Sequence, residues 1–194
     1  MNTIDPLLTI QSRAELRTWL EQHSTQSTYC WVIVSMTLAP NILLYLDVVE
    51  ECLCFGWIDG VKKKISETQL AQRISPRSSK SSWTELNKER VRRLEKLGYM
   101  TDAGRQVLPD MNKDHFVIHP SILQALQEDP EVYAHFLEFP DLYQRVRIDT
   151  IQSTQHQPEL FRNRLQKWIT NTKANKMYGQ WHDNGRLLDY HDPL

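Results

Sequence analysis

The sequence has few cysteines and no long apolar run. Its 194 residues contain three cysteines, and an odd number in a chain of this size argues against a disulfide framework and fits a reducing compartment. No apolar run approaches the roughly 18 residues needed to cross a bilayer. The N-terminal stretch MNTIDPLLTIQSR also lacks the basic and apolar regions of a secretory signal. We therefore expect a cytoplasmic protein without a transmembrane segment.

Motifs for metal or cofactor chemistry are also missing. Cys52 and Cys54 are two positions apart on a predicted helix, so they point to different faces and cannot hold one metal together. His115 and His119 have helical spacing, but Pro120 and the polar residues before them favour a loop or a short turn. The chain has no glycine-rich phosphate loop, serine elbow or HExxH motif. We expect neither a metal nor a cofactor, and the question of whether the protein is an enzyme stays open.

Positive charge is concentrated in one part of the chain. The formal net charge is -1, but residues 61–96 hold eleven basic and four acidic residues, whereas residues 1–60 hold two and seven. A basic patch on a nearly neutral protein attracts phosphates, nucleic acid or acidic surfaces. The charge distribution therefore predicts an anionic partner for the segment 61–96.

The N-terminal half alternates helices and strands. Ser12 and Glu15 form a capping box that begins a helix, and TYCWVIVSM is typical of a strand buried on both faces. Residues 44–55 predict a second helix, which ends at Gly56. Its predicted polar side consists of Asp47, Glu50, Glu51 and Cys54.

A β-hairpin is expected next, from WIDGVKKKI and TQLAQRIS. Polar residues alternate with apolar ones in both segments, which predicts one basic face and one apolar face. The residues expected on the apolar face are Val61, Ile65, Leu70 and Ile74.

Helices dominate the rest of the chain. Ser82 and Glu85 form a second capping box, before a helix over residues 83–97 that stops at Gly98. Further helices are predicted over residues 121–128, 130–138, 141–153 and 158–171. We expect an α+β fold, mainly helical, with a small β-hairpin or sheet in the N-terminal half and a helical C-terminal half. The predicted parts are 1–110, the helical 111–172 and a tail, 173–194, in one compact domain overall.

Two polar residues fall on the apolar stripe of the helix after Ser82. A projection at 100° per residue places Arg90 between Trp83 and Leu97, with Asn87 close to Trp83. A buried guanidinium needs a partner carboxylate, a backbone oxygen or a wet cavity. Arg90 therefore either pairs with Asp59 or Glu51 and pins the helix, or lines a cleft for an anion. The residues expected to face solvent are Lys88, Glu89, Arg92 and Arg93.

The stretch around Trp57 is predicted to be a corner of the fold. Gly56 and Gly60 flank it, so the indole is expected on a tight connection rather than in a long strand. Asp59 can accept from backbone N–H groups in a turn, or pair with Arg73, Lys80 or Arg90. Cys52 is expected to act as a small hydrophobe, and acidic neighbours are expected to raise the pKa of the Cys54 thiol, which argues against a nucleophile.

Two long segments, VVEECLCFGWIDGVKKK and QRISPRSSKSSWTELNKERVRRLEKLGYMT, resemble the bacterial YdeI/OmpD-associated (OmdA, bacteriocin-protection) family. That family has EALCFGWID, QRF-SPR and S-x-W-S-x-x-N-x-x-R in the same order. The resemblance is close over residues 45–101 and looser over residues 120–169. It implies a link to survival against membrane-active peptides and to an outer-membrane protein, but no established catalytic role. The matching residues are Trp57, Asp59, Arg73, Pro76, Arg77, Lys80, Trp83, Asn87 and Arg90.

We therefore predict a cytoplasmic YdeI-like binding protein linked to envelope or antimicrobial-peptide stress resistance, with a basic, tryptophan-lined pocket for an anionic small molecule. An enzyme acting on a small anionic substrate in the same pocket is the main alternative. A nucleic-acid-binding protein is the second alternative, and a homo-oligomer formed through the tail is a further prediction. The expected ligand-binding residues are Trp57, Asp59, Arg73, Arg77, Lys80, Trp83, Asn87 and Arg90.

Overall fold

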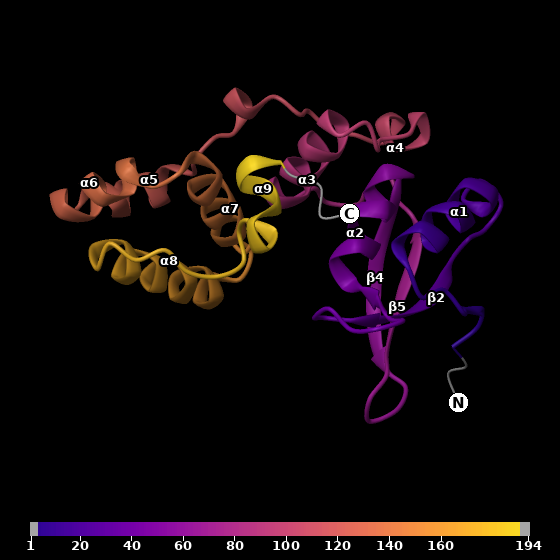
Figure 1. Ribbon diagram of the computed structural model, residues 1–194. Coiled ribbons are helices and arrows are strands. Elements are labelled where there is room, and N and C mark those ends of the chain that lie inside the picture. The colour runs from indigo at the N-terminus through magenta and orange to yellow at the C-terminus, as the bar shows by residue number, and fades with distance from the viewer. Residues whose placement is uncertain (1–3, 191–194) are drawn as a thin grey trace. The chain divides into compact units, whose positions relative to one another are not determined.

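The computed structural model describes residues 4–190, which divide into two units (Figure 1). Unit 1 consists of the chain up to Ser82 together with Arg90–Pro109. Unit 2 consists of Trp83–Glu89 and the chain from Asp110 onward. Helix α3 (Glu85–Lys96) contributes residues to both.

Unit 1 is built on a five-stranded mixed sheet. Its main path has the order β1-β2-β5-β4, and β3 pairs with β2. Strand β2 is parallel to β1 and β3 and antiparallel to β5, and β4 and β5 form the predicted antiparallel hairpin. The strands are β1 (Leu7–Leu8), β2 (Cys30–Ser35), β3 (Leu43–Leu44), β4 (Trp57–Lys64) and β5 (Leu70–Pro76).

A β-bulge changes which residues of β4 face inward. Asp59 lies opposite Ile74 and Lys62 lies opposite Gln72, so two residues of β4 face one residue of β5 between these pairs. The amide of Gln72 donates to the carbonyl O of Gly60 at 2.9 Å, inside the bulge. The predicted apolar face is therefore wrong for Val61 and Ile65, which are 59% and 36% exposed, because one extra residue reverses the alternation of side chains.

Three helices complete unit 1 besides its part of α3: α1 (Arg13–His23), α2 (Tyr45–Cys54) and α4 (Asp102–Gln106). The Ser12 hydroxyl accepts from the N–H of Glu15, as predicted for the start of α1. Helix α4 packs directly onto the end of α2. A Cβ at Gly104 would lie 2.2 Å from the carbonyl O of Cys54, so only glycine permits this approach.

Charged residues of unit 1 are buried where the sequence predicted solvent. Glu50 accepts from Arg13 and from Arg93, each at 2.8 Å, and all three side chains are buried. Glu51 accepts from Arg13 (2.7 Å) and from Arg17 (3.0 Å). The predicted polar side of α2 and the predicted solvent position of Arg93 are therefore wrong. Opposite charges from α1, α2 and α3 satisfy one another, which a helical projection of one segment cannot reveal.

Unit 2 is helical, and its four main helices confirm the prediction. Three of them begin at a proline, a residue that suits the first helical position because it has no N–H to leave unpaired. The elements are η1 (Lys113–His115), α5 (Pro120–Gln127), α6 (Pro130–Glu138), α7 (Asp141–Gln152), α8 (Pro158–Lys173), η2 (Asp183–Gly185) and α9 (Arg186–Asp189). With the small sheet of unit 1, they confirm the predicted α+β class.

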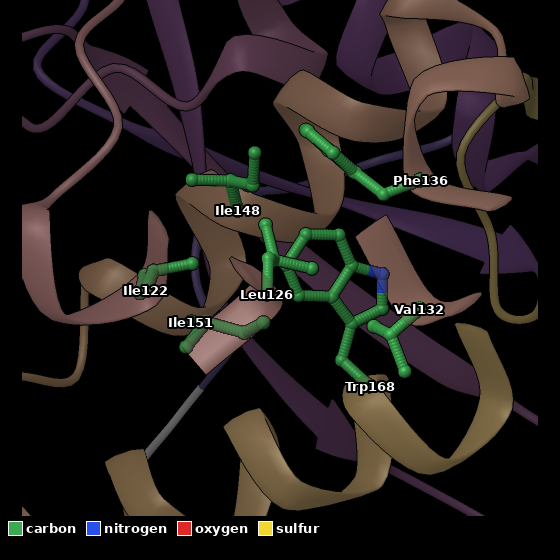
Figure 2. Packing of buried hydrophobic residues seen from close by; sticks show 7 residues of the cluster. All are labelled: Ile122, Leu126, Val132, Phe136, Ile148, Ile151 and Trp168. Atoms are coloured by element: carbon green, nitrogen blue, oxygen red, sulfur yellow. The ribbon is translucent and has the colours of Figure 1, made fainter. Parts of the chain in front are cut away.

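The core of unit 2 forms around Trp168 of α8. The indole is fully buried, and Figure 2 shows it at the centre of side chains from α5, α6 and α7. The ring of Phe136 meets it edge-on, with centroids 5.8 Å apart. The apolar faces of four short helices thus pack together into one hydrophobic core. The other members of this cluster are Ile122, Leu126, Val132, Ile148 and Ile151.

The segment after α8 belongs to a second core cluster of unit 2. Trp181 is buried, and its ring lies 5.4 Å from that of Tyr143, which in turn lies 5.1 Å from that of Phe139. The described part of the predicted tail therefore packs within this unit. Residues 191–194 of the tail lie outside the described range, and the single-domain division of the chain stays a prediction.

A second buried charge cluster lies in unit 2. Arg145 donates to Glu85 (2.7 Å), Glu89 (3.1 Å) and Asp141 (2.9 Å). Glu89 also accepts from the Tyr190 hydroxyl and from Lys113. The predicted solvent position of Glu89 is thus wrong, because Arg145 of α7 compensates its charge inside the protein.

Candidate functional site

Trp57, the first residue of β4, lies inside unit 1. Its side chain is 1% exposed, its indole N–H donates to the carbonyl O of Ser24 at 3.3 Å, and its ring meets that of Trp19 edge-on. Gly56 has a φ of +70°, so the chain passes from α2 into β4 without a loop. The prediction that Trp57 lies on a tight connection rather than in a long strand is therefore wrong, because Trp57 begins the eight-residue strand β4. Its side chain packs in the interior of unit 1.

Asp59 pairs with Tyr45, a residue outside the predicted ligand-binding set. The Tyr45 hydroxyl, at the start of α2, donates to Asp59 Oδ2 at 2.6 Å. Burial raises the pKa of Tyr45 above its ordinary value, the hydrogen bond to Asp59 raises it further, and the positive charge of Arg90 opposes the rise. At neutral pH the Tyr45 hydroxyl is therefore protonated and acts as a donor.

Lys62 lies beside this pair because of the bulge. Its ammonium nitrogen is 3.3 Å from the centroid of the Tyr45 ring, a close cation–π contact. Partial burial lowers the pKa of Lys62, and Asp59 opposes that effect. Without the extra residue in β4, Lys62 would point to the other face of the sheet.

Arg77 directly follows β5 and is buried. Its side chain donates to the carbonyl O of Ser82 at 3.0 Å, and its backbone N–H donates to that of Gly56 at 2.9 Å. Burial lowers the pKa of Arg77, while the negative charge of Asp59 acts to raise it. Arg77 thus lies within electrostatic reach of the same carboxylate.

Five residues of unit 1 therefore form one group, which we call the Asp59 cluster. Three of them were predicted from the sequence, and half-buried Arg90 belongs to it through its electrostatic effect on Tyr45. Positive groups thus act on one hydrogen-bonded Tyr45–Asp59 pair, an arrangement that can hold a small anion. The members are Tyr45, Asp59, Lys62, Arg77 and Arg90.

Other predicted residues lie elsewhere. Arg73 is adjacent to Ile74 on β5, and Ile74 is the residue opposite Asp59, so Arg73 points to the other face of the sheet. There its guanidinium lies 4.4 Å from the centroid of the Tyr29 ring. Lys80 is exposed in the loop after β5. Neither side chain belongs to the Asp59 cluster.

Trp83 and Asn87 belong to unit 2 and are both half-buried. The backbone N–H of Asn87 donates to the Thr84 hydroxyl at 3.1 Å, so Thr84 caps α3 and the predicted cap at Ser82 is wrong. A ligand-binding role for Trp83 or Asn87 stays a prediction.

The cysteines are buried thiols. Burial raises the pKa of Cys30 and of Cys54 to about 12 in each case, and in Cys54 the charge of Glu51 adds to the rise. Burial also raises the pKa of Cys52 well above its ordinary value. The predicted rise at Cys54 is confirmed, but its dominant cause is burial rather than an exposed acidic face. All three sulfurs are protonated at neutral pH and so are poor nucleophiles.

Two kinds of feature are absent from the described range, residues 4–190. In that range no group of three or more His, Cys, Asp or Glu side chains is placed to hold a metal ion. The same residues include no helix with the length and hydrophobicity of a membrane span.

The sequence carries no motif that distinguishes Tyr45 or Lys62 as a member of the Asp59 cluster. Tyr45 lies fourteen positions before Asp59 in the chain and is an ordinary aromatic residue of an amphipathic helix. Lys62 belongs to a run of three lysines whose orientation depends on the bulge. The glycine before Val61 was the available signal, because a glycine inside a strand pattern often marks a bulge.

Comparisons with known families divide the chain in two. Residues 8–107, more than half of the chain, match the model of a domain of unknown function, DUF8412. Residues 115–175 match the model described as bacteriocin-protection, YdeI or OmpD-associated (OmdA). The predicted family is thus confirmed over helices α5–α8, whereas the closely resembling segment 45–101 lies in the DUF8412 match. No curated protein and no solved structure matches the chain. The chain therefore belongs to the DUF8412 family, and residues 115–175 of its unit 2 are similar to the bacteriocin-protection, YdeI or OmpD-associated family.

Proposed function

We propose that the protein binds a small anionic molecule at the Asp59 cluster and acts in this way in protecting a bacterial cell against bacteriocins. The protective role is suggested by the description of the family that matches residues 115–175. The binding role rests on one observation: the Tyr45 hydroxyl donates to Asp59 at 2.6 Å, and the Lys62 ammonium lies 3.3 Å from the centroid of the Tyr45 ring. The charges of Arg77 and Arg90 act on the same pair.

The chemistry of the Asp59 cluster favours binding over catalysis. The pKa of Tyr45 is raised, so its hydroxyl is a hydrogen-bond donor and not a base at neutral pH. The neighbouring thiol of Cys52 is buried, and its pKa is also raised. Arginine and lysine side chains hold carboxylates and phosphates through charge-assisted hydrogen bonds. The groups at this position thus supply what an anion needs, without an activated nucleophile.

Burial of Trp57 disfavours nucleic-acid binding. Proteins that bind single strands use exposed aromatic rings on which bases stack. The Trp57 indole is enclosed by protein, and the ring of Tyr45 is covered by Lys62 at 3.3 Å. A small anion can be held by the cations alone, whereas a strand needs both cations and open ring faces.

Thermal stabilisation by small carboxylates and phosphate esters, at constant ionic strength, tests the proposal. We expect that Arg90→Met weakens binding of an anion that stabilises the wild type by about tenfold to a hundredfold, the worth of a charge-assisted hydrogen bond. Asp59→Asn should strengthen binding of the same anion, because it removes a negative charge. Titration calorimetry measures both affinities.

Arg105→Met is the matched control, since Arg105 is an exposed arginine of unit 1 that pairs with Glu95 on the surface. Its anion affinity should equal that of the wild type. Unchanged affinity in Arg90→Met, with an unchanged melting temperature in the absence of ligand, would remove the Asp59 cluster from consideration. Turnover of the stabilising anion would make the protein an enzyme, and salt-sensitive binding of oligonucleotides would favour the nucleic-acid alternative.

A further inference from the structure

Unit 2 contains a small basic pocket that none of the sequence motifs indicated. It lies between α7 and α8, has a volume of about 180 Å³, and is also lined by a tyrosine from the segment after α8. A water molecule occupies about 30 Å³ in the liquid, so the pocket has room for about six waters or for one compact anion. The lining residues are Arg147, Thr150, Ile151, Arg164, Lys167 and Tyr178.

The three cations of this pocket have no carboxylate partner among residues 4–190. Arg164 donates to the carbonyl O of Thr150 at 2.7 Å, and Arg147 donates to that of Gln180 at 3.3 Å. Arg147 also has a buried Nε that makes no hydrogen bond. The contrast with Arg145 is direct, because that residue, two positions earlier on α7, binds three carboxylates.

Aromatic and backbone contacts hold these cations at the pocket. The guanidinium of Arg147 and the ammonium of Lys167 lie 5.4 Å and 5.2 Å from the centroid of the Tyr178 ring. Gly179 has a φ of +76°, and a Cβ there would lie 2.6 Å from Arg147 Nη1. Glycine thus lets the backbone approach the guanidinium closely. Contacts with the Tyr178 ring restrict the cations without neutralising them.

Tyr178 adds a neutral donor. Burial raises the pKa of Tyr178, and the charges of Arg147 and Arg164 oppose the rise. The hydroxyl is therefore protonated at neutral pH and can donate to an anion. The surroundings reinforce the positive potential, since residues 158–178 contain five basic residues and one acidic residue.

We infer that the pocket lined by Arg147, Arg164, Lys167 and Tyr178 is a binding site for a phosphate group. A phosphate monoester carries a charge of about -1.5 to -2 at neutral pH and accepts several hydrogen bonds. Three cations and one hydroxyl therefore match a phosphate group better than they match a carboxylate group, which carries one charge. Arginine forks match its oxygens in a bidentate manner. The phosphate can belong to a soluble molecule or to a lipid headgroup. This site is independent of the Asp59 cluster.

Titration calorimetry of the full chain with inorganic phosphate and with glycerol 3-phosphate, in chloride buffer of matched ionic strength, tests the inference. Arg164→Met should weaken binding at least about tenfold, because it removes a charge-assisted donor. Lys167→Met should weaken it less, by about threefold to tenfold, since an exposed ammonium is partly screened. Arg162→Met is the matched control: it is an exposed arginine of the same helix outside the pocket lining, and its affinity should equal that of the wild type.

The source of the phosphate group is resolved with phosphatidylcholine vesicles that contain or lack phosphatidic acid. Sedimentation with the phosphatidic acid vesicles alone, released by Arg164→Met, would assign a lipid headgroup. Binding of glycerol 3-phosphate without sedimentation would assign a soluble phosphate. If Arg164→Met does not fold, Lys167→Met still tests the inference. The Lys167 side chain makes no hydrogen bond in the described range, so its replacement should not affect folding.

Wild-type affinity in both pocket variants would overturn the inference, as would the absence of binding to every one of these probes. Arg90→Met should leave phosphate binding at this pocket unchanged. A loss of binding in Arg90→Met but not in Arg164→Met would instead assign the phosphate to the Asp59 cluster. The two proposals therefore fail separately.

Discussion

Replacing Glu50 by Gln should lower the free energy of unfolding of unit 1 by about 3–5 kcal/mol, the usual cost of removing one member of a buried ion pair. Glu50 receives Arg13 Nη1 and Arg93 Nη1, each at 2.8 Å, and Arg93 is 0% exposed. The amide keeps the shape of the side chain but loses its charge. The guanidiniums of Arg13 and Arg93 would then lose one negative partner. The free-energy cost of burying their positive charge would no longer be fully offset.

Urea unfolding, monitored by hydrogen exchange of the amides in α1 and α2, measures this change in the stability of unit 1. Glu95→Gln is the matched control, since Glu95 is an exposed residue that pairs with Arg105. Exposed pairs contribute little to stability. Equal stability of Glu50→Gln and Glu95→Gln would contradict the interpretation that the buried network holds α1, α2 and α3 together.

Replacing Arg145 by Met should have a comparable effect on unit 2, about 3–5 kcal/mol. The change leaves Glu85 and Glu89, both buried, without the guanidinium that binds them at 2.7 Å and 3.1 Å. Lys88 and Lys113 still contact these carboxylates at 2.9 Å and 3.3 Å. Because these lysines still compensate part of the negative charge, we expect a loss of stability near the lower end of that range.

Two other substitutions isolate the role of the guanidinium. Arg145→Lys keeps the charge but cannot contact three carboxylates in one plane, so its loss should be intermediate. Lys173→Met removes an exposed pair with Asp129 in the same unit and should leave stability nearly unchanged. Hydrogen exchange of amides in α7 reports the result. A loss in Arg145→Met no larger than in Lys173→Met would show that the cluster is not needed for stability.

The helices of this protein could be predicted from the sequence, whereas its buried charges could not. Apolar spacing, prolines and caps are local signals, and they placed α5, α6, α7 and α8 within a few residues of their observed ends. Glu50 and Arg93 lie forty-three positions apart. Each is a typical surface residue on its own helix, and only the folded chain brings their charges together.

The two candidate binding sites could also be predicted only in part from the sequence. Asp59, Arg77 and Arg90 were predicted from a linear motif and a helical projection, and they lie at one cluster. Arg73 did not join them, because strand alternation places it on the other face of β5. The pocket proposed to bind phosphate takes Arg147 and Arg164 from different helices. No spacing along the chain distinguishes these two residues from surface arginines. Clusters assembled from distant segments leave no periodic signal.

Sequence similarity and folding have different boundaries in unit 2. The OmdA match ends at residue 175, but Trp181 fills a buried position against Tyr143, and Tyr178 forms a wall of the phosphate pocket. A fragment cut at the end of the match would expose the Tyr143 ring and remove Tyr178 from the lining of the pocket. A shortened form of this protein should therefore keep the chain through Tyr190, which follows α9 and donates to Glu89.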